Sequence, residues 1–154
     1  RNKIKYRVAK AGQVINFGGA KGFILGPPEQ FIEGTLSDPN NNSIVIRLVY
    51  RSTSFMLTGD LAFEGEKEIL DNGYLIKSDV LKIGHHGSST STSDEFLDAV
   101  SPKIAVICVG NDNKYGHPSQ AVLNKLLERG IKTYRTDQDG AVFLRSDGKK
   151  IEVL

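Results

Sequence analysis

Two apolar segments of this chain end abruptly at side chains that can bind a metal. Phe55-Met56-Leu57 is followed by Thr58-Gly59-Asp60, and Val80 to Ile83 is followed by Gly84-His85-His86-Gly87-Ser88. The chain has only 3 histidines, and two of them stand side by side in the second turn. A carboxylate and an imidazole at the ends of neighbouring strands are the components of a catalytic divalent-metal site. The pattern therefore predicts a layered sheet whose strand ends carry the chemistry.

The composition is that of one globular domain. The chain of 154 residues is 39% hydrophobic and 25% charged, and we expect a single domain over residues 1–154 with no internal boundary. A formal charge of +2 permits a phosphate-bearing partner but does not require one. The single cysteine, Cys108, excludes an intrachain disulfide. No apolar run approaches the roughly 18 residues of a membrane helix, so no membrane segment is predicted.

The predicted secondary structure changes character near Asp60. Before it, short strands are predicted over residues 3–9, 13–17, 22–25, 43–50 and 54–58. After it, helices predicted over residues 64–71, 92–100 and 118–129 alternate with strands over 80–83, 104–109 and 131–135, and two more strands over 141–145 and 150–153 close the chain. Thr92 and Glu95 match a capping box at the start of the second helix. The sum is an α/β (α+β) layered domain with a mixed sheet.

Asp60 has two interpretations. Because it follows a strand that requires burial, its carboxylate emerges where the sheet ends and could bind a metal. Gly-Asp after a strand is also ordinary turn chemistry, which needs no ligand to explain it.

The His85-His86 turn also has alternatives. Gly84 lets the backbone approach a ligand closely. In extended backbone, neighbouring side chains point to opposite sides, so one histidine would lie deep in a site and the other would face substrate or the next layer. Ser88 and the hydroxyl residues after it suit an anionic, phosphate-like ligand, although part of that run is explained as a loop and a helix cap. A core histidine bonded to backbone is the simpler alternative.

His117 lies in a polar loop, residues 111–118, between a predicted buried strand and a helix. Such loops are where α/β sheets bind ligands. His117 could act as a general acid or as a donor to a developing oxyanion. Alternatively, it is only the residue ahead of a proline that opens a helix.

Taken together, Thr-Gly-Asp after a strand, Gly-His-His-Gly-Ser and Tyr-Gly-His-Pro before a helix resemble the metallo-β-lactamase-fold hydrolases. More narrowly, they resemble the metallo-β-lactamase-like domain of DNA-internalisation competence proteins (ComEC-type). The resemblance covers roughly the last three quarters of the chain, from about Asp38. It implies an αββα layered fold, of which this chain is the second half only, a mixed sheet with helices on one face.

The resemblance also implies roles for individual residues. Asp60 would bridge two metals and His85 would be the last ligand of the second metal. His117 would be the catalytic donor, and His86 and Ser88 would face substrate. Asn40, Asn41 and Asn42 stand where the family places its third histidine, and Asn42 is assigned to substrate binding. The metal would be zinc or manganese, although an Asp/His set also suits iron.

The cluster His-x-His-x-Asp-His that defines the family is absent from this sequence. The chain alone therefore supplies about two ligands, where a hydrolytic zinc site needs three and an open position. The first residue is Arg1 and the only methionine is Met56, so we expect a fragment of a longer product that is inactive alone.

Three functions remain open at this point. The first is part of a metal-dependent phosphodiesterase or nuclease for DNA uptake, and the second is hydrolysis of another ester, such as a phosphorylcholine ester or a lactone. The third is a non-catalytic module that binds DNA or a partner. Expected partners are DNA, the N-terminal half of the same domain, a membrane channel domain of the parent protein and a second copy of the chain. The resemblance implies an extracytoplasmic domain, with a cytoplasmic one as the alternative.

Overall fold

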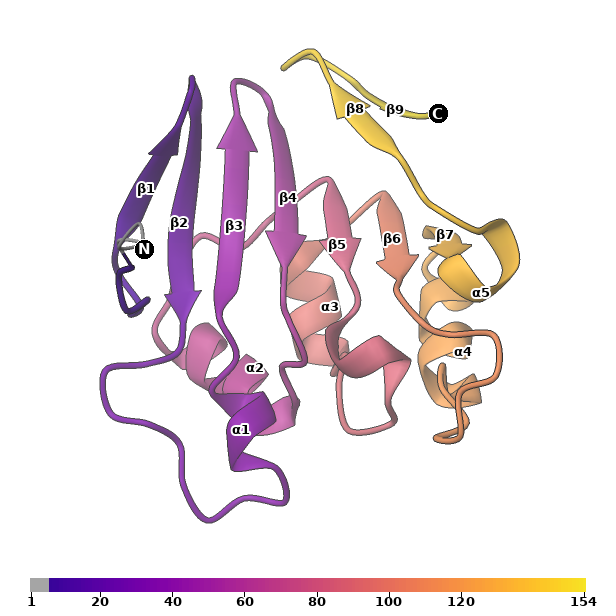
Figure 1. Ribbon diagram of the computed structural model, residues 1–154, viewed down its shortest axis with the longest axis horizontal. Coiled ribbons are helices and arrows are strands. Elements are labelled where there is room, and N and C mark those ends of the chain that lie inside the picture. Colours follow the sequence, from indigo (N-terminus) through magenta and orange to yellow (C-terminus); the bar gives the residue numbers. More distant parts are fainter. Residues whose placement is uncertain (1–5) are drawn as a thin grey trace, which may run out of the picture.

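The computed structural model describes residues 6–154, which form a mixed sheet with helices packed on it (Figure 1). The sheet has seven strands in the order of the sequence: β1 (Val14–Phe17), β2 (Ala20–Gly26), β3 (Val45–Tyr50), β4 (Thr53–Leu57), β5 (Val80–Lys82), β6 (Ile104–Ile107) and β7 (Lys132–Arg135). Neighbours from β1 to β4 pair antiparallel, and neighbours from β4 to β7 pair parallel. A separate hairpin of β8 (Leu144–Ser146) and β9 (Ile151–Val153) follows.

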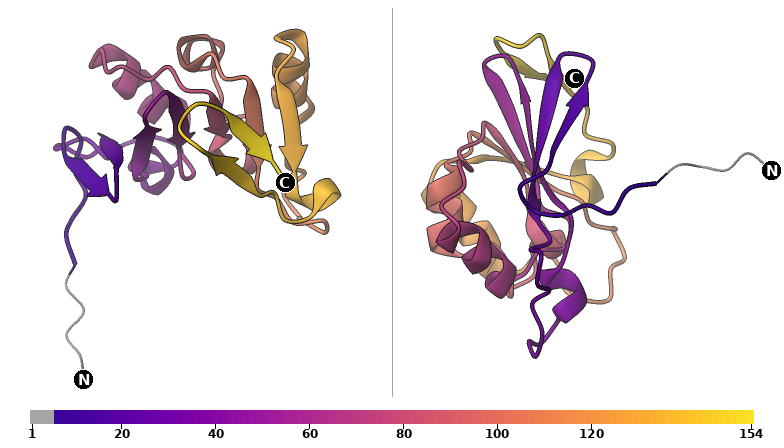
Figure 2. Two further views of the ribbon diagram at one scale, coloured as in Figure 1. Left: turned by 90° about the horizontal axis from the view of Figure 1, so that it is seen from above. Right: turned by 90° about the vertical axis from the view of Figure 1, so that its left-hand side faces the viewer.

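Three helices cover one face of this sheet, as Figure 2 shows: α2 (Phe63–Asp71), α3 (Asp94–Val100) and α4 (Gln120–Glu128). Their apolar sides and the strands beneath them form the core, whose fully buried members include Met56, Leu81, Ile83, Phe96 and Leu126. Three shorter elements lie outside these layers: α1 (Asp38–Asn41), the 3₁₀ turn η1 (Gly84–Gly87) and α5 (Thr136–Asp139). The predicted fold class is confirmed.

Several predicted boundaries were wrong. Residues 6–9 form no strand, and the rest of the strand predicted over 3–9 lies outside the described residues. Residues 38–41, for which no helix was predicted, form α1, and the strand predicted over 141–145 begins only at Leu144. The capping box also does not form, because Thr92 has a left-handed backbone (φ 62°). Ser93 caps α3 instead, and its Oγ accepts the N–H of Phe96 at 3.3 Å.

The parallel half of the sheet places the chemistry-bearing residues at one edge. Strands β4, β5 and β6 run in the same direction, so the loops that follow them emerge together. These loops carry Asp60, the pair His85 and His86, and His117, respectively. The chemistry predicted at the strand ends therefore lies along one edge of the sheet.

Candidate active site

The turn after β4 fixes the position of Asp60. Gly59 has a left-handed backbone (φ 58°), which turns the chain sharply, and Asp60 donates its N–H to Ser43 Oγ at 3.1 Å. Thr58 Oγ1 donates to the carbonyl oxygen of Lys82 at 2.7 Å, which ties the turn to β5. The turn at Gly59 and these two hydrogen bonds therefore fix the backbone around Asp60, whose carboxylate is itself partly exposed.

Lys82 joins the loop that carries Asp60 to the turn that carries His85 and His86. Its Nζ donates to the carbonyl oxygen of Gly59 at 2.8 Å and to that of Ile83 at 3.1 Å, so one ammonium group grips the residues just before Asp60 and just before Gly84. Burial lowers the pKa of Lys82, while the nearby Cys108 and Asp60 oppose that shift. The sequence analysis did not single out this residue, although a lysine inside a buried apolar strand could have drawn attention to it.

The His-His turn has a backbone that the sequence did not predict. His85 (φ 44°, ψ 43°) and His86 (φ 55°, ψ 21°) both adopt left-handed conformations within η1. The expected extended backbone, with the two side chains on opposite sides, was therefore wrong: the two ring centroids lie 6.4 Å apart. Gly84 is required here because a Cβ at that position would fall 2.7 Å from the carbonyl oxygen of Leu61.

His86 faces Asp60. Its Nδ1 lies 2.6 Å from the carbonyl oxygen of Cys108, and because a carbonyl can only accept, Nδ1 carries the proton. Its Nε2 lies 3.5 Å from Asp60 Oδ1. A metal-binding histidine usually donates its second ring N–H to such an acceptor, and here the nitrogen left with a free lone pair is the one that faces Asp60. The sequence analysis expected His86 to face substrate, whereas in the structure its Nε2 faces the Asp60 carboxylate.

His117 approaches the same cluster from the loop after β6. Its ring centroid lies 5.6 Å from that of His85. Ser119 donates its N–H to the Gly87 carbonyl at 2.8 Å, which joins the two turns. They pack so closely that a Cβ on Gly87 would fall 2.6 Å from Pro118 Cβ. Burial, and then the charges of His85 and His86, lower the pKa of His117. The neutral ring that this favours still offers one N–H donor.

The three consecutive asparagines have different roles. Asn40 Nδ2 lies 3.3 Å from Nδ1 and 3.2 Å from Nε2 of His85, and a single donor cannot align with both ring nitrogens. Asn41 is buried and braces α2, where its Oδ1 accepts the N–H of Gly65 at 3.0 Å. Asn42 donates both amide hydrogens, at 2.8 Å each, to the carbonyls of Ile32 and Asp38. Asn40 is therefore the member that reaches the cluster, and Asn42 holds the loop before it.

Ser88 is a loop brace in this structure. It is 5% exposed, its Oγ accepts the N–H of Thr90 at 3.3 Å, and it shares a 3.0 Å hydrogen bond with Thr90 Oγ1. The sequence places Ser88 next to the histidines but cannot show this burial, which removes the hydroxyl from the open side of the cluster.

Residues 6–154 do not hold a complete metal centre. No group of three His, Cys, Asp or Glu side chains among them could hold a metal ion together. Asp60 and His86 fit two ligand positions, because a carboxylate oxygen and a ring nitrogen face each other with the opposite ring nitrogen fixed by backbone. Hydrolytic zinc sites use three protein ligands. The described residues thus fit part of a centre and not the whole.

The fold and this edge cluster define a protein of the metallo-β-lactamase class. A family model described as the Metallo-beta-lactamase superfamily matches residues 22–111, and the chain belongs to that family.

Its relatives include competence proteins. The chain is 40% identical over 139 residues to ComE operon protein 3 of Bacillus subtilis (strain 168), an overlap that covers 88% of this chain and 17% of that protein. It is 45% identical over 106 residues to competence protein ComA of Neisseria gonorrhoeae, covering 68% of this chain and 15% of that one. The chain thus spans about a sixth of the length of these relatives.

A solved structure supports the fold independently. A protein of Parabacteroides distasonis assigned as a metal-dependent hydrolase superposes with a TM-score of 0.56 and 17% sequence identity, covering 86% of this chain and 58% of that one. At this identity the likeness concerns the fold. Within residues 6–154, no helix has the length and apolar character needed to cross a membrane.

Proposed function

We propose that this chain is part of a metal-dependent hydrolase that cleaves phosphodiester bonds of DNA during its uptake. The observation that carries the proposal is the His86 geometry: Nδ1 bound to the Cys108 carbonyl and Nε2 at 3.5 Å from Asp60. This is the arrangement of a prepared ligand pair. The substrate class rests on the relatives, which are named as competence proteins.

Within this proposal the residues divide by position. Asp60 and His86 hold the metal, which revises the assignment of that role to His85. His85 and His117 lie beside this pair with their ring centroids 5.6 Å apart, and Asn40 contacts His85. His117 donates to the oxygen on which charge develops. The remaining metal ligands, zinc or manganese being the expected ions, come from outside residues 6–154.

A second candidate is a binding module without catalysis. The lack of a three-ligand group among residues 6–154 favours it. Hydrolysis of a phosphorylcholine ester or a lactone has no comparable observation in its favour.

The partners follow from the same relatives. DNA, an N-terminal half of the same domain and a membrane channel domain would accompany this chain, on the outer side of a membrane. The similarity to much longer competence proteins supports this arrangement.

The test is DNA cleavage by the intact protein with added Mn²⁺ or Zn²⁺. Asp60→Asn removes a charge at nearly constant shape, and it should cost several orders of magnitude in rate with little change in DNA affinity. His117→Ala should cost roughly 10²- to 10⁴-fold, as expected for a lost proton or hydrogen-bond donor. Asp71→Asn is the matched control, because Asp71 forms only a surface pair with Lys67 on α2. Cleavage by Asp60→Asn at the wild-type rate would exclude the hydrolase and leave the binding module.

A further inference from the structure

Tyr115 is an exposed aromatic residue held against the candidate site. Its side chain is 83% exposed, yet its ring lies nearly parallel to that of His117, at 18° and 5.9 Å between centroids. One face of the ring is therefore turned to the cluster and the other to solvent. Single exposed aromatics are common on protein surfaces, but this one stacks on a residue of the candidate site.

The loop around Tyr115 is closed by its own hydrogen bonds. Asn113 Oδ1 accepts the N–H of His117 at 2.9 Å, and Asn113 Nδ2 donates to the His117 carbonyl at 2.8 Å and to the Gly110 carbonyl at 3.1 Å. Gly116 supplies the left-handed backbone (φ 69°) that this tight turn needs. These bonds brace the backbone on both sides of Tyr115, from which its ring projects beside that of His117.

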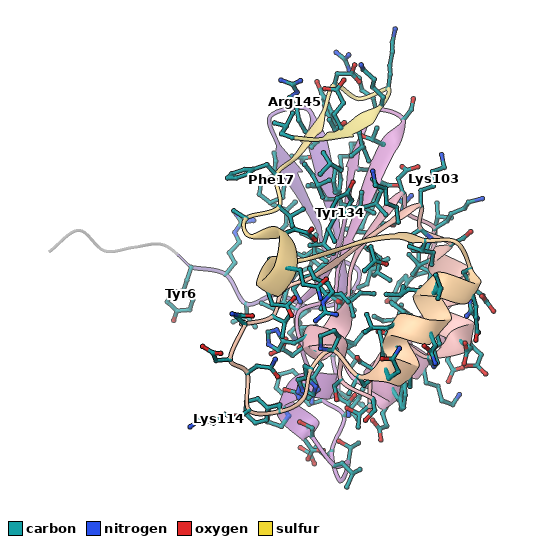
Figure 3. All side chains as sticks on the ribbon, turned by 90° about the vertical axis from the view of Figure 1, so that its right-hand side faces the viewer. Tyr6, Phe17, Lys103, Lys114, Tyr134 and Arg145 are labelled. Atoms are coloured by element: carbon teal, nitrogen blue, oxygen red, sulfur yellow. The ribbon has the colours of Figure 1, made fainter. Side chains whose placement is uncertain are left out.

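Tyr115 is the outer end of a row of planar groups. The row continues inward from His117 to His85, 5.6 Å apart, and from His85 to His86, which faces Asp60. Lys114 is exposed, and Figure 3 shows it pointing away from the molecule at the tip of the same loop. An exposed aromatic ring and an exposed cation are thus neighbours in sequence where the row meets solvent.

We propose that the outer face of Tyr115 is a stacking platform for one nucleobase of single-stranded DNA, with Lys114 against the neighbouring phosphate. Aromatic platforms beside basic side chains are how proteins bind single strands without reading sequence. In a duplex both faces of each base are covered by its neighbours, so only an unstacked base can use this platform. A neutral ligand such as a sugar carries no negative charge for Lys114 to bind. This inference rests on the proposed function, and it specifies that the DNA substrate is single-stranded at this position.

The experiment measures DNA binding by the intact protein with metal removed by chelation, so that no cleavage occurs. Fluorescence anisotropy compares a labelled oligothymidylate, an abasic oligonucleotide of the same length and a duplex. Tyr115→Ala should weaken oligothymidylate binding about 5- to 150-fold, the loss expected for one stacked base, and should leave abasic and duplex binding unchanged. Tyr115→Phe should bind as wild type does, because it keeps the ring.

Two further variants make the result specific. Tyr6→Ala is the matched control: Tyr6 is 87% exposed, and Figure 3 shows it apart from the Lys114 loop. It should not change binding. Lys114→Ala should weaken oligothymidylate and abasic binding equally and reduce the salt dependence by about the amount of one phosphate contact.

The outcomes separate this inference from the proposed function. Unchanged oligothymidylate binding by Tyr115→Ala, or an equal loss for the abasic strand, would overturn the platform while leaving DNA hydrolysis standing. Failure of the wild type to bind any of the three DNAs would overturn both. A Tyr115-dependent preference for bases in a protein whose Asp60→Asn variant cleaves normally would retain the platform and reject the hydrolase.

Discussion

His86 donates its Nδ1 proton to a backbone carbonyl, whereas His85 meets only the Asn40 amide between its two ring nitrogens. The difference matters because a fixed second nitrogen orients the first toward a metal. His85 and His86 are adjacent in sequence and differ in nothing that a sequence pattern can detect. Both have a left-handed backbone, so what distinguishes them is the Cys108 carbonyl, which lies against Nδ1 of His86 alone.

Loss of His86 should therefore weaken metal binding more than loss of His85 does. In the intact protein, His86→Ala should lower the affinity for Mn²⁺ or Zn²⁺ more than about 100-fold, since even the loss of a supporting group costs 10- to 100-fold. His85→Ala should lower it less than about tenfold. Isothermal titration calorimetry of both variants measures this. The reverse order would restore His85 as the ligand and leave His86 facing substrate.

The three consecutive asparagines face different parts of the molecule. The sequence analysis treated all three as candidates for one ligand position. In the structure Asn40 contacts His85, Asn41 bonds to α2, and Asn42 bonds to the loop before α1. Which of three consecutive side chains faces a site depends on the short helix α1, whose rotation no local pattern predicted.

At the scale of elements, Glu66 links α2 to the loop that follows the histidines. It is 1% exposed, and its carboxylate accepts the N–H groups of Thr92 at 2.5 Å and Ser93 at 2.8 Å. Lys125 on α4 donates to the Thr92 carbonyl at 3.0 Å. This brace explains why the predicted capping box was wrong: Glu66 takes the N–H of Thr92 and moves the helix cap to Ser93.

Glu66 should also make stability depend on pH. Burial raises the pKa of Glu66, against the opposing effect of its bonds to Ser93 and Thr92 and of the Lys125 charge. A carboxyl whose folded-state pKa lies above its unfolded value stabilises the fold fully below the ordinary pKa of about 4.3, and that contribution falls as pH rises through the folded-state value.

The free energy of unfolding of wild type and Glu66→Gln, measured in urea from pH 4 to 8, tests this. The variant should be less stable by about 1–3 kcal/mol at the acid end, because the amide leaves one backbone N–H without an acceptor. The difference should shrink as pH rises. Glu95→Gln, an exposed position on α3, is the control. A difference that grows with pH would mean that the pKa of Glu66 is lowered in the folded state.

For the whole molecule, the sequence predicted the parts that depend on local pattern and strand direction. The apolar runs predicted the strands β4, β5 and β6, and placed Asp60, the histidine pair and His117 in the loops that follow them. Contacts between distant segments were not predictable, such as Lys82 bridging two loops or Ser43 holding Asp60. These bonds join residues whose spacing carries no periodic pattern, so only the assembled sheet brings them together.

The assembled sheet also leaves an apolar edge open. All four residues of β1 are exposed, among them Val14 at 52%, Ile15 at 40% and Phe17 at 52%. β1 pairs only with β2, so its outer backbone groups have no strand beside them among the described residues. An exposed apolar edge strand is a template for pairing with another strand. We therefore expect the 154-residue chain to self-associate, or to need a covering segment to stay in solution.

Sedimentation velocity over a range of protein concentrations measures this association. Ile15→Lys should shift the chain toward monomer, because a charge on an edge strand opposes strand-to-strand pairing. Leu36→Lys is the matched control: Leu36 is 97% exposed but lies in the loop before α1, away from the sheet, so it should leave association unchanged. If the wild-type chain stays monomeric at high concentration and binds no hydrophobic dye, the β1 edge is protected by its own twist and shortness. If both lysine variants dissociate the chain equally, net charge governs association and the edge does not.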